Sequence, residues 1–159
     1  MRQININIVI DHCQIEELAA GDRELVERAL KATYNAYAEY SHFYVGAALR
    51  LADGSIVTGA NQENAAFPSG LCAERTAIFA AQANFPDQAV TTLAIAARND
   101  NGLLDEPVSP CGACRQVILG VEDRYKQPIR ILLYGKKGVY CIKSVKDLMP
   151  LSFVGSSME

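Results

Sequence analysis

Four residues in two short segments have the types and spacing that zinc chemistry needs. Cys72 and Glu74 stand two positions apart, and Cys111 and Cys114 form a Cys-x-x-Cys pair further along the chain. Two cysteines three positions apart lie on one helical face, so both can reach a single ion. Zinc held by three protein ligands keeps a fourth tetrahedral position for water, which is typical of a catalytic site. The pattern predicts a zinc site formed by Cys72, Cys111 and Cys114.

Glu74 lies so close in sequence to Cys72 that it has no need to bind the same ion. Its predicted use is as the catalytic proton shuttle. A carboxylate beside a metal-activated water can take a proton, deliver it to a substrate, and return one to the leaving group.

An arginine directly follows two residues of this pattern, at Arg75 after Glu74 and at Arg115 after Cys114. Three thiolates give a zinc site net negative charge, which keeps the pKa of a bound water high. We expect both guanidinium groups to donate to cysteine sulfurs and to withdraw part of that charge.

The cysteines also allow other interpretations. A Cys-x-x-Cys pair alone is typical of a redox motif or of half a structural zinc site. A structural site needs a fourth ligand, and the remaining candidates, Cys13, Cys141, His12 and His42, form no ligand-like pair. Cys13 and Cys141 are predicted to be ordinary thiols, with Cys141 in the core, and His42 a solvated loop histidine.

The elements that must position these residues follow from hydrophobic periodicity and turn signals. Alternating isoleucines predict an added edge strand over residues 3–10, and helical spacing after an N-cap at Asp22 predicts a helix to about Glu39. The other predicted elements are strands over 44–51, 55–61, 90–97, 129–134 and 139–142, and helices over 72–84, 110–125 and about 145–149. Both cysteine segments then fall at helix N-termini, where free N–H groups and the helix dipole favour thiolates.

The order of these elements predicts the fold class. Strands alternate with helices, which is typical of a three-layer α/β/α domain, here with a central mixed sheet. No internal repeat, low-complexity tract or linker interrupts the pattern. We therefore expect a single domain over residues 1–159, with residues 1–21 as an N-terminal extension.

Composition limits the class of protein. The 159 residues are 50% hydrophobic, so a sizeable core is within reach. Lysine and arginine number 15 against 18 aspartate and glutamate, which disfavours a nucleic-acid partner. No apolar run approaches the roughly 18 residues that span a bilayer, and residues 1–5 lack the apolar core of a signal peptide. We expect a soluble, cytoplasmic protein without a membrane partner.

These motifs together resemble the cytidine deaminase family, specifically its small three-cysteine members. Zinc deaminases share a ligand-x-Glu segment followed by Pro-Cys-x-x-Cys, which this chain has at 72–74 and 110–114. The resemblance covers residues from about 25 to 154. The other segments that match in order and spacing are 43–48, 61–65, 67–68, 75–78, 109, 115–116, 148–150 and Phe153.

The resemblance implies how a nucleoside would bind. Asn61 and Glu63 are similar to the family's pair that hydrogen-bonds the ribose 3′-hydroxyl, and Phe43 to the aromatic that packs on the substrate. Ala73 is expected to offer its backbone N–H to the pyrimidine carbonyl. Phe153 is expected to reach into a neighbouring subunit's site, which implies a homotetramer with one zinc per subunit. An amide beside a carboxylate suits a hydroxyl and repels a phosphate, which favours nucleosides over nucleotides.

The predicted function is hydrolytic deamination of cytidine and deoxycytidine to uridine and deoxyuridine in pyrimidine salvage. The alternatives are a deaminase for a blasticidin-type nucleoside antibiotic, an RNA- or DNA-editing enzyme, and a non-catalytic zinc-stabilised binding domain. The ribose motif at 61–64 argues against the first, the acidic balance against the second, and Glu74 against the third. Gln62 and Phe67 stand where the family usually has an aliphatic residue and a tyrosine, which bears on substrate preference rather than on reaction type.

Overall fold

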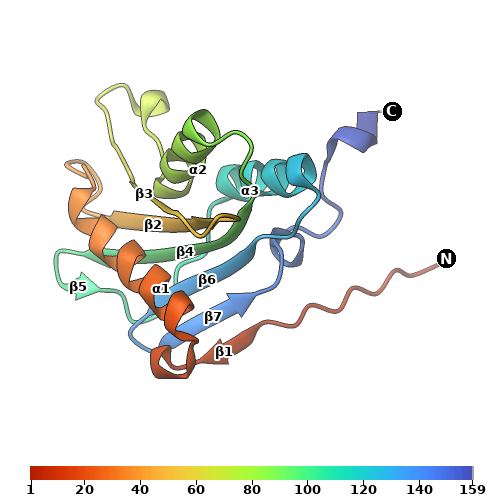
Figure 1. Cartoon of the computed structure of the whole chain (residues 1–159), viewed down its shortest axis with the longest axis horizontal. Helices are drawn as coiled ribbons and strands as arrows, with labels where there is room; N and C mark the ends of the chain where they lie inside the picture. The colour runs from red at the N-terminus through yellow and green to blue at the C-terminus, as the bar shows by residue number, and fades with distance from the viewer. Residues whose placement is uncertain (159) are drawn as a thin grey trace.

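A mixed sheet of seven strands forms the centre of the molecule, with helices on both faces (Figure 1). The computed structural model describes residues 1–158. The strands are β1 (Asp11–Cys13), β2 (Tyr44–Leu51), β3 (Ile56–Ala60), β4 (Val90–Asn99), β5 (Gly102–Leu103), β6 (Arg130–Gly135) and β7 (Gly138–Ile142). Their order is β1-β7-β6-β4-β2-β3, with β5 paired to β4. Only the β4–β6 pair is parallel among the described strand pairs, which confirms the mixed sheet.

Three α-helices cover the sheet. They are α1 (Ala20–Ala32), α2 (Ala73–Asn84) and α3 (Gly112–Tyr125). Helix α1 packs on one face, and α2 and α3 pack on the other. Short 3₁₀ turns occupy Ile15–Glu17, Thr33–Asn35, Phe67–Ser69, Val145–Leu148 and Gly155–Met158. The predicted three-layer α/β/α arrangement is confirmed.

Strand alternation divides the core into two layers. In β4, Leu93 and Ile95 pack toward α2 and α3, whereas Ala94 and Ala96 pack toward α1. Successive side chains of a strand point to opposite faces, and a central strand covered on both faces is apolar throughout. The side facing α1 is rich in alanine, so that helix can lie close to the sheet.

Two glycines set the distance between helices and sheet. A Cβ atom on Gly46 in β2 would lie 2.0 Å from the carbonyl oxygen of Ala29 in α1. A Cβ atom on Gly59 in β3 would lie 2.5 Å from the backbone nitrogen of Ala77 in α2. Glycine is therefore required where each helix touches the sheet backbone.

The N-terminal segment differs from its prediction. The edge strand is present, but it is β1 at Asp11–Cys13, and residues 3–10 lie outside it. Asp11 pairs with Cys141, so residue 10 lies opposite Ile142, the last residue of β7. Earlier residues therefore have no strand beside them, and Ile4 is 79% exposed. Figure 1 shows this segment extending away from the sheet.

Helix α1 also departs from the prediction at both ends. It starts at Ala20, and Asp22 lies inside its first turn rather than at the N-cap. The buried Asp22 carboxylate pairs instead with Arg50 of β2 and Arg130 of β6. The helix ends at Ala32 and continues only as the turn Thr33–Asn35, well before Glu39.

The elements around the two cysteine segments follow the prediction closely. The strand over 44–51 is confirmed, and α2 begins directly after Cys72. Helix α3 begins at Gly112, with Cys111 as N-cap, so Pro110 precedes the helix instead of opening it. The predicted loop 99–109 contains the short strand β5, which pairs with the end of β4.

Candidate metal and active site

The three predicted zinc ligands meet at the N-termini of two neighbouring helices. Cys72 is the N-cap of α2, Cys111 is the N-cap of α3, and Cys114 lies in the first turn of α3. Their Sγ atoms all lie within 4.8 Å of one another, and those of Cys72 and Cys111 are 3.9 Å apart. Residues distant in sequence are thus brought together because α2 and α3 pack side by side on the sheet (Figure 1).

This sulfur arrangement fits zinc. Tetrahedral zinc with Zn–S bonds of about 2.3 Å places its sulfurs roughly 3.8 Å apart, close to the observed separation of Cys72 and Cys111. Among residues 1–158, no other group of three or more histidine, cysteine, aspartate or glutamate side chains is close enough to hold an ion. The group supplies three ligand atoms, one fewer than a structural zinc site uses.

The local charges favour a thiolate at Cys72. A hydrogen bond from Cys114, followed by one from the Arg75 guanidinium, lowers the pKa of Cys72 to about 5. Nη2 of Arg75 lies 3.5 Å from Sγ of Cys72. The contact predicted for Arg75 is therefore present, and it draws electron density from the sulfur.

Arg115 makes a different set of contacts from those predicted. Its Nε donates to the carbonyl oxygen of Pro110 at 2.9 Å, and its Nη1 donates to that of Leu148 at 2.8 Å. Within the described part of the chain, its hydrogen bonds are to carbonyls and none is to a sulfur. Because α3 starts only after Cys111, the Arg115 side chain turns back to tie the segment before the helix to the 3₁₀ turn at Val145–Leu148.

Glu74 is the second residue of α2 and is only 5% exposed. Burial is the main cause that raises the pKa of its carboxyl group. A carboxyl group with a raised pKa holds a proton more readily near neutral pH, which suits a group that must both accept and donate one.

A cavity of about 440 Å³ is lined by Cys72 and Cys111, two of the predicted zinc ligands, and by Glu74. Its lining includes predicted site residues from four parts of the chain: Phe43, Asn61, Glu63, Cys72, Glu74 and Cys111. Its size lies within the range of pockets that bind small organic molecules, roughly 300 to 1,000 Å³. The tertiary fold therefore places the predicted metal, proton-transfer and sugar-binding residues around one space.

Asn61 and Glu63 are both held by hydrogen bonds to the loop before β2 and to the start of that strand. Oδ1 of Asn61 accepts from the Val45 N–H at 2.7 Å, and its Nδ2 donates to the Phe43 carbonyl at 2.9 Å. Oε2 of Glu63 accepts from the N–H groups of Tyr40 at 2.8 Å and Ser41 at 3.2 Å. Hydrogen bonds, first that of the Ser41 hydroxyl, lower the pKa of Glu63.

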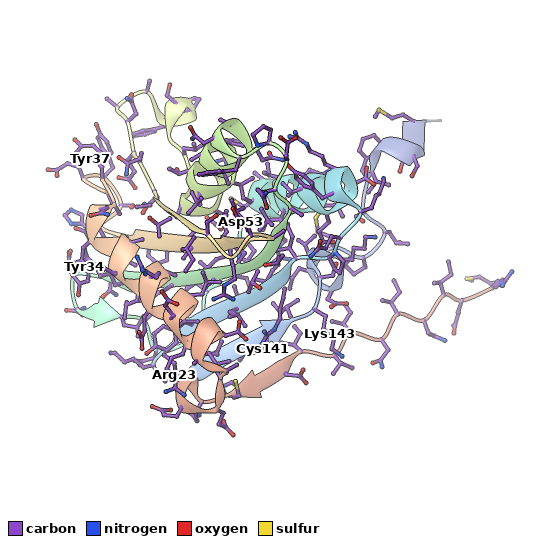
Figure 2. The ribbon with its side chains drawn as sticks, in the orientation of Figure 1. Arg23, Tyr34, Tyr37, Asp53, Cys141 and Lys143 are labelled. Atoms are coloured by element: carbon purple, nitrogen blue, oxygen red, sulfur yellow. The ribbon has the colours of Figure 1, made fainter. Side chains whose placement is uncertain are left out.

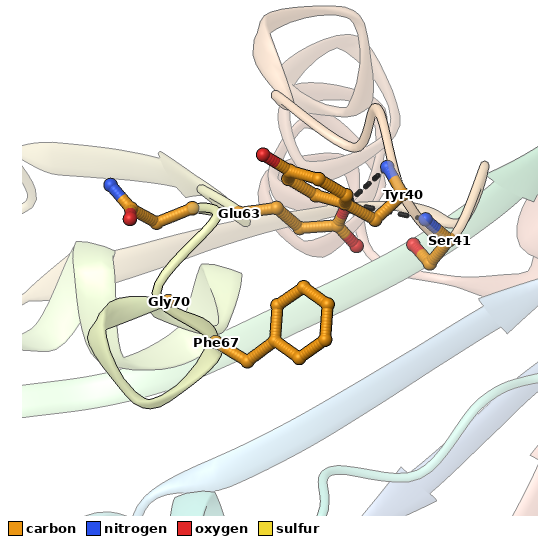
Figure 3. A pocket seen from close by; sticks show the side chains of 6 residues that line it. Tyr40, Ser41, Glu63, Phe67 and Gly70 are labelled. Carbon is orange, nitrogen blue, oxygen red and sulfur yellow. Dashed lines mark hydrogen bonds between the residues drawn. The ribbon is translucent and has the colours of Figure 1, made fainter.

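A second hollow of about 320 Å³ adjoins the cavity and shares Ser41 and Glu63 with it (Figure 3). Phe67 lies at this hollow, where its ring meets that of Tyr40 edge to face at a centroid distance of 5.6 Å. His42 is exposed and 3.3 Å from Asp100, as expected of a solvated loop histidine.

Two of the remaining predicted residues lie apart from the cavity lining. Ala73 is fully buried at the first position of α2. Phe153 is 57% exposed and lies over α3, where Nε2 of Gln116 donates to its carbonyl. Ser41 and Ser109 also line the cavity, although the sequence predicts no role for Ser41 and places Ser109 only within a segment that resembles the family. Ser109 stands directly before Pro110-Cys111, and that position is the signal that could have identified it.

Comparison with known proteins places the chain in a family. The profile of the "Cytidine and deoxycytidylate deaminase zinc-binding region" matches residues 20–125. A protein of Halalkalibacterium halodurans called cytidine deaminase is 38% identical over 139 residues, which cover 87% of this chain and 98% of that protein.

Solved structures agree in fold. The 1.6 Å crystal structure of cytidine deaminase from Burkholderia pseudomallei has a TM-score of 0.70 and 37% identity, covering 82% of this chain and 97% of the other. The crystal structure of cytidine deaminase from Mycobacterium tuberculosis has a TM-score of 0.64 and 30% identity, and the match covers 82% of this chain and 95% of the other. The fold predicted from the sequence is confirmed. The chain belongs to the cytidine and deoxycytidylate deaminase family.

Proposed function

We propose that this protein catalyses the zinc-dependent hydrolytic deamination of cytidine and deoxycytidine to uridine and deoxyuridine. The observation that carries the proposal is a cluster of three cysteine sulfurs, two of which line the same cavity as the buried Glu74. The H. halodurans relative and the two solved structures bear the name cytidine deaminase, which supports the choice of substrate.

Cys72, Cys111 and Cys114 would hold the ion. Bound zinc would supply a Lewis acid that lowers the pKa of a water molecule. Glu74 accepts a proton from the attacking water and passes it to the ring nitrogen next to carbon 4 of cytosine. It then takes the second proton from the oxygen added to carbon 4 and supplies it to the leaving amino group; the bond between carbon 4 and that nitrogen breaks, and water and cytidine become uridine and ammonia.

The remaining predicted site residues orient the nucleoside. Glu63 is a carboxylate with a lowered pKa, so it stays charged, accepts a hydrogen bond from a sugar hydroxyl and repels a phosphate. Asn61 lies beside it, Phe43 packs against the substrate, and the N–H of Ala73 binds the pyrimidine carbonyl. This arrangement favours nucleosides over nucleotides.

We also propose a homotetramer that acts in cytoplasmic pyrimidine salvage. The exposed ring of Phe153 lies outside its own chain's cavity, which supports a role in a neighbouring subunit's site. No helix in the described part of the chain is long and apolar enough to cross a membrane.

A deaminase assay on the wild type and the Glu74→Gln variant tests the reaction. Cytidine, deoxycytidine, cytidine monophosphate and blasticidin are compared, and bound zinc is measured by mass spectrometry. We expect turnover of the two nucleosides, and a loss of kcat of about 10²- to 10⁴-fold in Glu74→Gln with zinc retained. The control is Glu24→Gln, the same change at an exposed carboxylate on α1.

Other outcomes separate the alternatives. Turnover of blasticidin alone would indicate an antibiotic deaminase, and preference for the monophosphate would contradict the role of Glu63. If the zinc-loaded wild type converts none of the four compounds, the proposal fails and the remaining interpretation is a non-catalytic zinc-stabilised binding domain.

A further inference from the structure

Cys13 and Cys141 form a second pair of thiols outside the metal and active site. Cys13 ends β1 and stands opposite Val139 in the antiparallel ladder with β7. Since alternate residues of a strand share a face, Cys141 lies on the same face as Val139, diagonally across from Cys13. The two Sγ atoms are 3.9 Å apart.

The sheet separates this pair from the metal ligands. Both cysteines pack against the apolar cluster that lies under α1. The ligand cysteines lie at the starts of α2 and α3, which pack on the opposite face. Figure 2 shows Cys141 at the β1 edge of the sheet, away from those two helices.

The two thiols differ in reactivity. Burial, followed by a hydrogen bond that the Cys141 thiol donates to Cys13, raises the pKa of Cys141 to about 11. A thiol with such a pKa is a poor first nucleophile at neutral pH. Cys13 lies in the terminal strand of the sheet, where no further strand among the described residues covers its outer edge. Attack on an external reagent therefore begins at Cys13.

We propose that Cys13 and Cys141 are a thiol–disulfide site, which a low-molecular-weight disulfide oxidises to an intrachain bond while the three ligand cysteines keep their metal. The Cys13 thiolate attacks one sulfur of the reagent, forming a mixed disulfide and releasing one thiol. The Cys141 thiolate then attacks the Cys13 sulfur, forming the Cys13–Cys141 bond and releasing the second thiol. Two electrons pass to the reagent, and the two cysteine protons end on the released thiols.

The geometry makes the second step short. A disulfide bond is about 2.05 Å long, so the two Sγ atoms, now 3.9 Å apart, have to approach by about 2 Å, and both cysteines are partly exposed. Arg130 forms a hydrogen bond with the Cys141 sulfur, which favours its thiolate in the resolving step.

The bond would secure an otherwise weakly attached strand. β1 has only three residue pairs with β7. The cross-link would join positions 128 residues apart, and closing so large a ring restricts the unfolded chain strongly. The oxidised protein is therefore expected to be more stable than the reduced protein.

Oxidation of the zinc-loaded full-length protein tests the proposal. The reduced protein is incubated with oxidised glutathione, free thiols are alkylated, and cysteine peptides and bound zinc are measured by mass spectrometry. We expect a Cys13–Cys141 linked peptide, three alkylated cysteines, unchanged zinc, and a Tm higher by roughly 5 to 15 °C. A disulfide that includes a ligand cysteine, or five thiols left free, would overturn the proposal.

Two serine variants test the order of the steps. In Cys141→Ser, glutathione should remain bound to Cys13 as a stable mixed disulfide, because the resolving thiol is gone. In Cys13→Ser, Cys141 should react at least about tenfold more slowly. Equal rates of glutathione uptake in the two variants would contradict attack at Cys13. As a control for folding, the Tm of each variant under reducing conditions should equal that of the reduced wild type.

Discussion

Two carboxylates in one cavity have pKa values shifted in opposite directions, and each shift has its own physical cause. Burial raises the pKa of Glu74, so it can hold and release a proton. Hydrogen bonds from Ser41 and Tyr40 lower the pKa of Glu63, so it stays charged and accepts hydrogen bonds (Figure 3). Such divergence separates a proton-transfer group from a binding group.

At this scale, Ser41→Ala should change the pH dependence of substrate binding. Loss of the hydroxyl that stabilises the charged form raises the pKa of Glu63, so its carboxylate is protonated at a higher pH. As pH falls from about 6 to 4, through the ordinary pKa of a glutamate, KM for cytidine should begin to rise earlier in the variant than in the wild type, with kcat less affected. The measurement is KM against pH at equal zinc content.

The control for this change is Ser55→Ala, which removes a hydroxyl that donates to Asp53 in the β2–β3 turn. It should leave the KM profile unchanged. Identical profiles for Ser41→Ala and the wild type would show that this hydroxyl does not govern Glu63.

The helices depend on close backbone approach at single glycines. Gly59 faces α2, which carries Cys72 at its N-cap and Glu74 in its first turn, whereas Gly46 faces α1 on the other side of the sheet. The two positions therefore have similar steric demands but different neighbours. A shift of α2 therefore moves Cys72 and Glu74 directly, whereas α1 carries none of the predicted site residues.

Gly59→Ala should therefore reduce activity, because α2 must shift to admit the methyl group. We expect kcat to fall at least about tenfold with weaker zinc retention. Gly46→Ala should lower the free energy of unfolding by roughly 1 to 3 kcal/mol while folded enzyme keeps its kcat. Gly120→Ala in α3 meets no atom within 4 Å and is the control. Equal kcat values in Gly59→Ala and Gly46→Ala would contradict the prediction that the position of α2 controls the site.

The C-terminal end of α3 depends on a buried carboxylate. Glu122 accepts hydrogen bonds from the N–H groups of Ile129 at 2.8 Å and Val145 at 3.0 Å, and from the Ser144 hydroxyl at 2.7 Å. Glu122→Ala leaves buried donors without a partner and should lower the free energy of unfolding by about 2 to 4 kcal/mol. Urea denaturation measures the change. The exposed control Glu24→Ala should stay within about 0.5 kcal/mol of wild type, and a similar value for both would refute the role of Glu122.

At the scale of the whole molecule, the cavity draws its lining from stretches of chain that are distant in sequence and that the sheet brings together. Phe153 lies elsewhere, over α3, with its ring largely exposed. If the proposed tetramer brings this ring to a neighbouring cavity, a complete site needs residues from two copies.

Coexpression of Glu74→Gln with Phe153→Ala tests that dependence. Each homo-oligomer lacks one required residue in every site. A mixed oligomer would contain some sites with Glu74 from one copy and Phe153 from another, so its activity should exceed that of both variants alone. Separately purified variants, mixed without subunit exchange, are the control. Activity of the coexpressed pair equal to the average of the two would contradict a shared site.

Several parts of the fold could be predicted because their signals are local. The strand over 44–51 and the helix after Cys72 follow from short-range periodicity and were placed within a residue or two. The edge strand was misplaced because alternating isoleucines satisfy the pattern of a strand whether or not a neighbouring strand exists. The position of β1 depends on where β7 ends, which the N-terminal sequence does not encode.

By itself, the sequence determined the set of chemical groups: three cysteines and a glutamate whose spacing suits zinc and proton transfer, in the order of one family. Only the tertiary structure decided which partners distant residues meet. It directed Arg115 to the carbonyls of Pro110 and Leu148, and it brought Cys13 beside Cys141. Ligand spacing within a helix turn is a property of the local backbone, whereas these contacts arise only when separate elements pack together.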